Sequence, residues 1–289
     1  MNKILIVCGP TATGKTKFGI EMARQLNGEI VSADSRQVYT GKNLIHGKDI
    51  PYKLKATSSQ LKWRDRFLKY YDVDGIKIWL YDVVDPGDEF NVAFWKECAD
   101  LIIKDITSRN KLPIVVGGSG LYLESLTRKL DQISTPPNKL LRQKLVGKSV
   151  KYLFNYLNKI DSFRAAQLNI SDRSNPRRLI RAIEISQSST TYNPQSTTFN
   201  FLQIGLTAPR DFLYKLVDQR ILDRLASGAA LEDPDLTADI PAWQSREHSI
   251  IRHQITWFKR HLPAHWIDIS DSQWYSTAQL LILNWYNKN

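Results

Sequence analysis

The feature that most constrains this chain is a glycine-rich loop close to its N-terminus. Residues 9–16 read Gly-Pro-Thr-Ala-Thr-Gly-Lys-Thr, which fits the pattern G-x-x-x-x-G-K-[ST] in full. The apolar run Ile4–Cys8 before the loop lacks polar alternation, as in a buried parallel strand. Lys17–Leu26 after it has helical spacing and ends at Asn27-Gly28. A strand, such a loop and a helix together predict an α/β fold with a phosphate site.

The chemistry of the loop follows from its residue types. Glycines let backbone N–H groups converge on phosphate oxygens, and a helix N-terminus adds about half a positive charge. Lys15 is expected to reach the terminal phosphate, and the Thr16 hydroxyl is expected to bind Mg²⁺, the predicted cofactor. The predicted phosphate-binding residues are Gly9, Pro10, Thr11, Ala12, Thr13, Gly14, Lys15 and Thr16.

Strand and helix patterns alternate along much of the chain. Glu29–Ala33 and Leu112–Val116 read as further buried strands, and Phe94–Ser108 reads as an amphipathic helix. The fold class is therefore α/β, a P-loop NTPase-like, mainly parallel sheet flanked by helices. Toward the C-terminus we expect strands at Phe201–Leu206 and Trp266–Ile269, helices at Asp211–Ala226 and Arg246–Arg260, and a loop at Leu231–Ile240.

A basic segment interrupts this alternation. Between residues 138 and 182 there are eleven Lys or Arg side chains and two acids, a net charge of +9 in a chain whose total is +11. Leu140–Leu157 and Ser162–Ser186 have helical spacing, and Ser186–Thr198 reads as a polar loop. We predict a basic helical insertion over 137–198 within a core made of 1–136 and 199–289. Charge concentrated in this way indicates that the segment binds a nucleic-acid backbone. The alternative interpretation is a charged surface that only faces solvent.

Two further segments should lie at the mouth of the phosphate site. Asp34 follows the second strand, where a carboxylate faces the crevice of a parallel sheet and can accept a proton or order Mg²⁺. Gly117-Gly118-Ser119 follows the Leu112–Val116 strand, and Ser119 could donate a hydrogen bond to a phosphate or a base. By themselves these residues leave several reactions open, since most such loops bind ATP or GTP.

Composition excludes several other classes of protein. Two cysteines without a CxxC pair disfavour a zinc or disulfide framework. No apolar run approaches the roughly 20 residues that span a bilayer, and Ile4–Cys8 is too short for a signal-peptide core, so we expect a cytoplasmic protein with no membrane partner. There is no NKxD motif for guanine and no dense carboxylate cluster for a metal-dependent nuclease.

Taken together, the segments resemble the isopentenyltransferase family that modifies tRNA adenine. The resemblance spans nearly the whole chain and rests on segments in the family's order: GPTATGKT (9–16), SADSRQVY (32–39), DVVDP (82–86), LPIVVGGSGLYLESL (112–126), NPRRLIRAIEI (175–185), IGLTAPRDFLYKLVDQR (204–220) and RHQITWFKRHLPAHWID (252–268). It implies that the loop holds dimethylallyl diphosphate. It also implies that N6 of an adenine beside the anticodon, at position 37, attacks the allyl carbon as diphosphate leaves.

The resemblance also implies a role for each site residue. Asp34 would be the general base, and Lys15 and Ser119 would complete the catalytic set; Ser119 replaces the family's usual Thr. The residues implied to contact tRNA are Asp34, Ser35, Arg36, Gln37, Ser119, Arg142, Arg177, Arg178 and Arg181. The partners are then dimethylallyl diphosphate and a tRNA anticodon stem-loop, and we expect a monomer.

The chain also departs from the family pattern. Ile78-Trp79-Leu80 stands where the family has His-His-Leu, and the segment I-G-Y-[KR]-E is missing between Gly228 and Trp243. Residues 247–254 are less basic than the corresponding family segment, so the RNA contacts are the part in doubt. An adenylate isopentenyltransferase acting on a free nucleotide, a P-loop small-molecule kinase and a non-enzymatic RNA-binding protein remain the alternatives.

Overall fold

The structure is a computed structural model that describes residues 3–51, 54–128, 135–188 and 199–288. Its contacts divide the chain into two compact units, one formed by 1–127 with 197–289 and the other by 128–196. The sequence placed the limits of the insertion at 137 and 198. The proposed polar loop over 186–198 lies outside the described residues from 189 onward.

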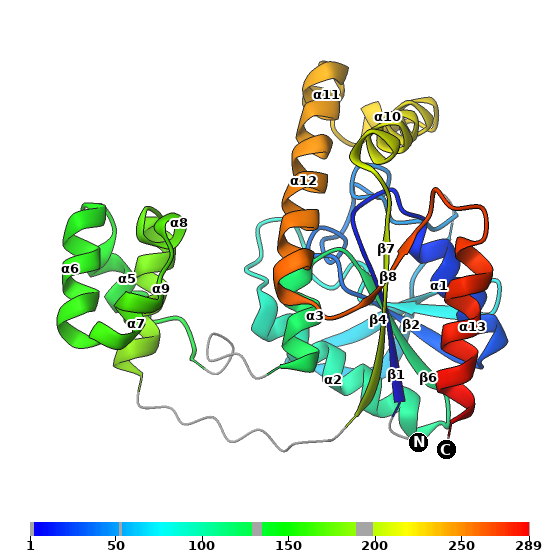
Figure 1. Cartoon of the computed structure of the whole chain (residues 1–289), viewed down its shortest axis with the longest axis horizontal. Helices are drawn as coiled ribbons and strands as arrows, with labels where there is room; N and C mark the ends of the chain where they lie inside the picture. Colours follow the sequence, from blue (N-terminus) through cyan, green and yellow to red (C-terminus); the bar gives the residue numbers. More distant parts are fainter. Residues whose placement is uncertain (1–2, 52–53, 129–134, 189–198, 289) are drawn as a thin grey trace. The chain divides into compact units, whose positions relative to one another are not determined.

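The first unit is built on an eight-stranded, mainly parallel sheet (Figure 1). Its strands are β1 (Lys3–Cys8), β2 (Gly28–Ser32), β3 (Thr57–Trp63), β4 (Arg66–Val73), β5 (Ile76–Trp79), β6 (Leu112–Gly117), β7 (Asn200–Thr207) and β8 (His265–Asp268). They lie in the order β3-β4-β5-β2-β6-β1-β7-β8. All neighbours from β5 to β8 pair in parallel, whereas β3, β4 and β5 pair antiparallel. This confirms the predicted fold class.

The central strands are apolar throughout because helices cover both faces of the sheet. The helices of this unit are α1 (Lys15–Gln25), α2 (Val92–Ser108), α3 (Gly120–Thr127), α10 (Arg210–Ala226), α11 (Pro234–Thr237), α12 (Ile240–His261) and α13 (Trp274–Asn287), with a 3₁₀ turn at Ala229–Leu231. α1 and α13 cover one face, and α2, α3 and α12 cover the other (Figure 1). Among the described residues, no helix combines the length and apolar composition needed to cross a membrane.

The second unit consists of short helices around its own core. They are α5 (Lys139–Leu145), α6 (Val150–Ile160), α7 (Ser162–Gln167), α8 (Ile170–Arg173) and α9 (Pro176–Gln187). Leu153, Leu157, Leu179 and Ile183 form its buried centre. Each helix begins at a polar residue whose side chain accepts a backbone N–H bond, in the order Asn138, Ser149, Asp161, Asn169 and Asn175.

Several local expectations were wrong. The single helix predicted over Leu140–Leu157 is two, because Gly147 has a φ of +79° and Ser149 starts a new helix. The loop predicted over Leu231–Ile240 contains α11, whose first turn holds Pro234 after the N-cap Asp233. α12 begins at Ile240 rather than Arg246, because Asp239 caps it. The antiparallel β3–β4 hairpin was not predicted.

Candidate active site

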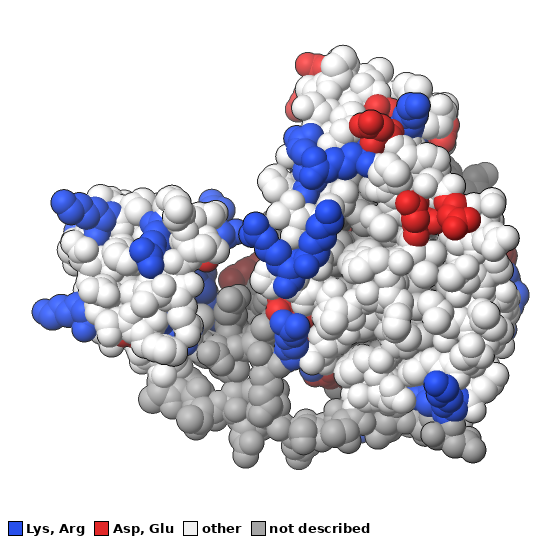
Figure 2. All heavy atoms as spheres, in the orientation of Figure 1, with Lys and Arg blue, Asp and Glu red and all other residues white. Residues whose placement is uncertain are grey.

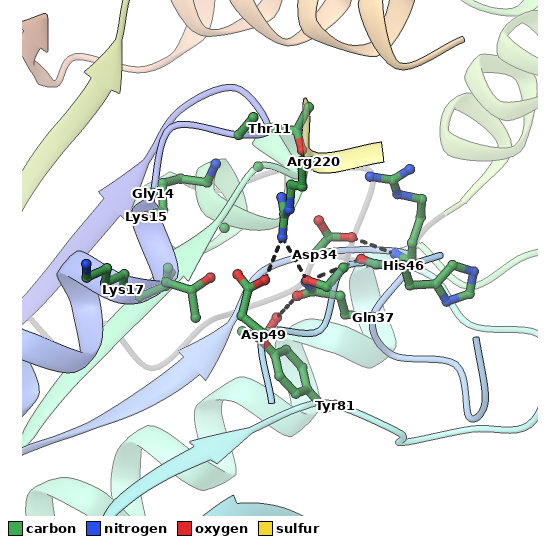
Figure 3. Close-up of a pocket in the computed structure, with 18 of the residues that line it drawn as sticks. Thr11, Gly14, Lys15, Lys17, Asp34, Gln37, His46, Asp49, Tyr81 and Arg220 are labelled. Atoms are coloured by element: carbon green, nitrogen blue, oxygen red, sulfur yellow. Dashed lines mark hydrogen bonds and ion pairs between the residues drawn. The ribbon is translucent and has the colours of Figure 1, made fainter. Parts of the chain in front are cut away.

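A cavity of about 340 Å³ opens at the carboxyl ends of the central strands of the sheet. The loop after β1, the segment after β2 and the glycines at the end of β6 line it, together with side chains from α10 and α12 (Figure 3). Parallel strands bring these segments together because their carboxyl ends meet at one edge. The cavity therefore holds the loop and Asp34, which the sequence predicted to be neighbours.

The phosphate loop keeps its shape because two glycines occupy positions closed to other residues. Gly9 has a φ of +143°, and a Cβ on it would lie 2.1 Å from the Leu206 carbonyl oxygen of β7. Gly14 has a φ of +74° and stands as N-cap of α1, without a side chain over the helix end. The first turn of α1 is thus open to an anion from the cavity.

Lys15 is held inside this loop. Its ammonium group donates to the Pro10 carbonyl oxygen and lies 3.4 Å from Thr13 Oγ1. Burial and the positive charge of Arg220 lower the pKa of Lys15 to about 8, although Asp34 acts in the opposite direction. A phosphate in the loop would favour the charged form of this ammonium group.

A glutamine of α12 forms hydrogen bonds with both the phosphate loop and the end of β6. Gln254 Oε1 accepts from the Thr11 N–H at 2.9 Å, and Gln254 Nε2 donates to the Gly118 carbonyl oxygen at 3.0 Å. The Thr11 N–H is therefore engaged within the protein, while Ala12, Gly14 and Lys15 line the cavity. Sequence reasoning gave Gln254 no role.

The segment after β2 carries the predicted base. Asp34 lines the cavity, and its Oδ1 accepts from the Arg36 N–H at 2.8 Å, which fixes the carboxylate. Ser119 Oγ accepts from the Ser35 N–H at 2.8 Å and lies 3.2 Å from Ser35 Oγ. Ser119 is not among the cavity-lining residues; it braces the segment that presents Asp34.

Arg36 and Gln37 are both engaged with the protein. Arg36 Nη1 donates at 2.9 Å to Glu247 of α12, whose side chain is only 2% exposed. Burial alone would lower the pKa of Arg36, but Asp34 and Glu247 raise it above its usual value. Gln37 accepts from Ser32 and donates to the Gly47 carbonyl oxygen, each at a distance of 2.9 Å or less. Both residues line the cavity that contains Asp34.

The cavity has further polar residues that sequence reasoning missed. Arg220 of α10 pairs with Asp49 at 2.6 Å (Figure 3). Arg224 lies one helical turn later and also lines the cavity. His46 and Tyr81 also line it. The spacing of the two arginines was a signal in the sequence. Residues four apart on a helix share a face, so Arg220 and Arg224 could have been predicted to lie on the same face of α10. Nothing local in the sequence marks Asp49 or His46.

Ile78 and Trp79, which stand where the family has two histidines, belong to the core. Both residues lie in β5 and are buried, and the Trp79 indole N–H donates to Glu29 at 2.9 Å. Neither lines the cavity. Asp82, beyond the same strand, accepts from Lys48 and from the Tyr71 hydroxyl. The region therefore supports the sheet rather than the pocket.

The predicted RNA-binding arginines of the second unit fall into two groups. Arg142 and Arg181 both pair with Glu184, whose side chain is fully buried, at 2.7 and 2.8 Å. These contacts join α5 to α9 and lower the pKa of Glu184 even though burial opposes them. Arg177 and Arg178 are exposed on the first turn of α9, and Arg178 pairs with Asp172. Figure 2 shows basic side chains over the surface of this unit.

The chain matches family models over most of its length. Residues 69–247 match the model described as IPP transferase, and residues 2–68 match the one described as isopentenyl transferase. A tRNA dimethylallyltransferase of Anoxybacillus flavithermus is 31% identical, with 93% of this chain and 91% of the relative covered. One of Acetivibrio thermocellus is 37% identical, with 80% and 71% covered.

Solved structures agree with these matches. The crystal structure of the full-length tRNA isopentenylpyrophosphate transferase from Bacillus halodurans superposes with a TM-score of 0.65 at 26% identity, covering 99% of this chain and 97% of that one. A eukaryotic dimethylallyltransferase acting on tRNA gives a TM-score of 0.74 at 20% identity, covering 98% and 79%, which supports the fold alone. The cavity, its phosphate loop and these matches agree, and the chain belongs to the IPP transferase family.

Proposed function

We propose that the protein transfers a dimethylallyl group from dimethylallyl diphosphate to N6 of the adenine next to the anticodon, position 37, of tRNA, releasing diphosphate. The observation that carries the proposal is the meeting of Lys15 and Asp34 in one cavity. The names of the relatives support the same reaction. We expect it to take place in the cytoplasm, where tRNA is found, and expect a monomer to suffice.

The chemistry needs one anion site and one proton acceptor. The adenine N6 attacks C1 of the allyl group, so that a C–N bond forms and the C1–O bond to diphosphate breaks. The proton of the amine passes to the Asp34 carboxylate. The departing diphosphate gains negative charge, which Lys15 and the loop N–H groups stabilise more strongly in the transition state than in the ground state.

The donor set fits a magnesium ion shared with the substrate. Thr16, Asp34 and Asp49 offer a hydroxyl and two carboxylates to the cavity. Among the described residues, no group of three or more His, Cys, Asp or Glu side chains is placed to hold a metal ion, and Mg²⁺ is commonly held by one or two side chains plus substrate phosphates. Thr16 is the residue that would hold it. Bound there, Mg²⁺ would supply positive charge to the leaving diphosphate.

The direct experiment is incubation with labelled dimethylallyl diphosphate, Mg²⁺ and unmodified tRNA, followed by nucleoside analysis. Label in N6-dimethylallyladenosine at position 37 is the expected result. Label transferred only to free adenosine monophosphate would assign the small-nucleotide reaction instead. Phosphoryl transfer from ATP without prenyl transfer would identify a kinase.

Binding of the donor should weaken as the pH rises above 8. Below that pH Lys15 is already protonated, whereas above it the free enzyme must take up a proton to bind an anion. The dissociation constant of the unreactive thiolodiphosphate analogue should rise by up to about tenfold per pH unit above 8. Calorimetry at several pH values tests this, and a constant affinity between pH 7 and 9.5 would contradict it.

The basic unit should supply the salt-dependent part of tRNA binding. Arg177 is exposed, so Arg177→Ala should weaken binding and reduce the slope of log K against log salt by about 1. Filter binding at several salt concentrations measures the slope. Arg24→Ala, an exposed arginine on α1, is the matched control and should leave it unchanged. An unaltered slope in Arg177→Ala would remove this residue from the interface.

A further inference from the structure

Arg224 is a buried cation at the active-site cavity. It lies in the last turn of α10, is 7% exposed and lines the cavity. Within the described parts of the chain, no hydrogen bond or ion pair of its guanidinium group is found. Burying a charge without a partner is costly, so such a group is expected to meet an opposite charge during function.

A second arginine converges on the same point. A Cβ built on Gly47 would lie 2.1 Å from Arg224 Nη2 and 3.0 Å from Arg220 Nη2, so the two guanidinium groups approach one spot beside this glycine. Arg220 has Asp49 as partner at 2.6 Å. The charge of Arg220 also lowers the pKa of Arg224, after burial, to about 10, which leaves Arg224 charged at neutral pH. Two like charges this close favour an anion between them.

The nearby carboxylate does not neutralise Arg224. Glu247 attracts Arg224, but its Oε1 accepts from Arg36. Glu247 Oε2 is buried and has no hydrogen-bond partner in the described part of the structure. Asp49 also attracts Arg224, but it is paired with Arg220 at 2.6 Å. Arg36, Arg220 and Arg224 thus face only two carboxylates, Asp49 and Glu247, and this cluster keeps an excess positive charge.

We propose that Arg224 is a donor-binding residue, which contacts the diphosphate of the prenyl donor beside Arg220 and Lys15. This inference rests on the proposed function for the identity of the donor. A guanidinium group matches phosphate with two parallel N–H bonds, so Arg224 adds directed hydrogen bonds as well as charge. Glu247 positions Arg36 and moderates the repulsion within the cluster.

The test is Arg224→Met, which keeps length but removes charge. The dissociation constants of inorganic diphosphate and of the thiolodiphosphate analogue should rise about 10- to 100-fold. Arg224→Lys should fall between this variant and the wild type. The Tm of the ligand-free variant should equal or exceed that of the wild type, because an unpaired charge has been removed. Arg210→Met, at the exposed start of α10, is the control and should bind normally.

Two outcomes would overturn the inference. One is Arg224→Met binding both diphosphates within twofold of the wild type. The other is a lower Tm of ligand-free Arg224→Met, with both the Tm and diphosphate binding restored in the double variant Arg224→Met/Glu247→Gln. In that case Arg224 would serve only as the counter-charge of Glu247. The readout does not involve tRNA. Failure of wild-type prenyl transfer would therefore reject the proposed function, while loss of diphosphate binding would still support Arg224.

Discussion

Replacing Asp34 by alanine should reduce the rate of prenyl transfer by about 10²- to 10⁴-fold, the range expected for loss of a general base. The adenine amine is a weak nucleophile, and Asp34 is held at the carboxyl end of β2, where its carboxylate lines the cavity. Binding of tRNA should stay close to that of the wild type, because the basic surface of the second unit is unaltered. Single-turnover transfer with saturating tRNA measures the rate.

The control for this variant is Asp34→Asn. Asp34 also accepts the Arg36 N–H bond, and an asparagine keeps that acceptor while losing the ability to take a proton at neutral pH. If asparagine is as inactive as alanine, the proton-accepting role is supported. If asparagine restores turnover, Asp34 holds the segment in place and the base must be sought elsewhere.

Lys15→Met should have the second large effect, about 10²- to 10³-fold on kcat, the usual consequence of losing one charged group that stabilises a leaving anion. The affinity for the donor should fall as well, because Lys15 lies within the loop that would hold the diphosphate. The pH dependence of donor binding should also disappear, since Lys15 is the group that carries it. Pre-steady-state transfer and calorimetry separate the two effects.

Lys17→Met is the matched control for Lys15→Met, because it removes the same charge from the same helix. Lys17 stands at the edge of the same cavity on the same helix, but it is exposed, so solvent screens its interaction with the donor. We expect its rate to stay within about threefold of the wild type. Equal losses in Lys15→Met and Lys17→Met would mean that total charge, and not the position of Lys15 in the loop, governs the reaction.

The sequence by itself determined the features whose causes are local. The run Ile4–Cys8, the glycines of the loop and the helix after it interact with near neighbours, so their pattern predicts their structure. The same holds for the helical character of the second unit. Its break at Gly147 was missed, and the single helix predicted over Ser162–Ser186 is three, because Asn169 and Asn175 each cap a new helix. Asp34 was predicted to line the cavity because the carboxyl ends of parallel strands lie at the same edge of a sheet, where ligands bind.

Only the tertiary structure decided the contacts between distant segments. Arg36 meets Glu247, Thr11 meets Gln254, and Arg220 meets Asp49, each pair more than 170 residues apart in the chain. The β3–β4 hairpin likewise depends on the sheet edge it joins. Periodicity reports which face of an element is buried but not which segment covers it, so the cations that surround the phosphate loop could be located only in the folded chain.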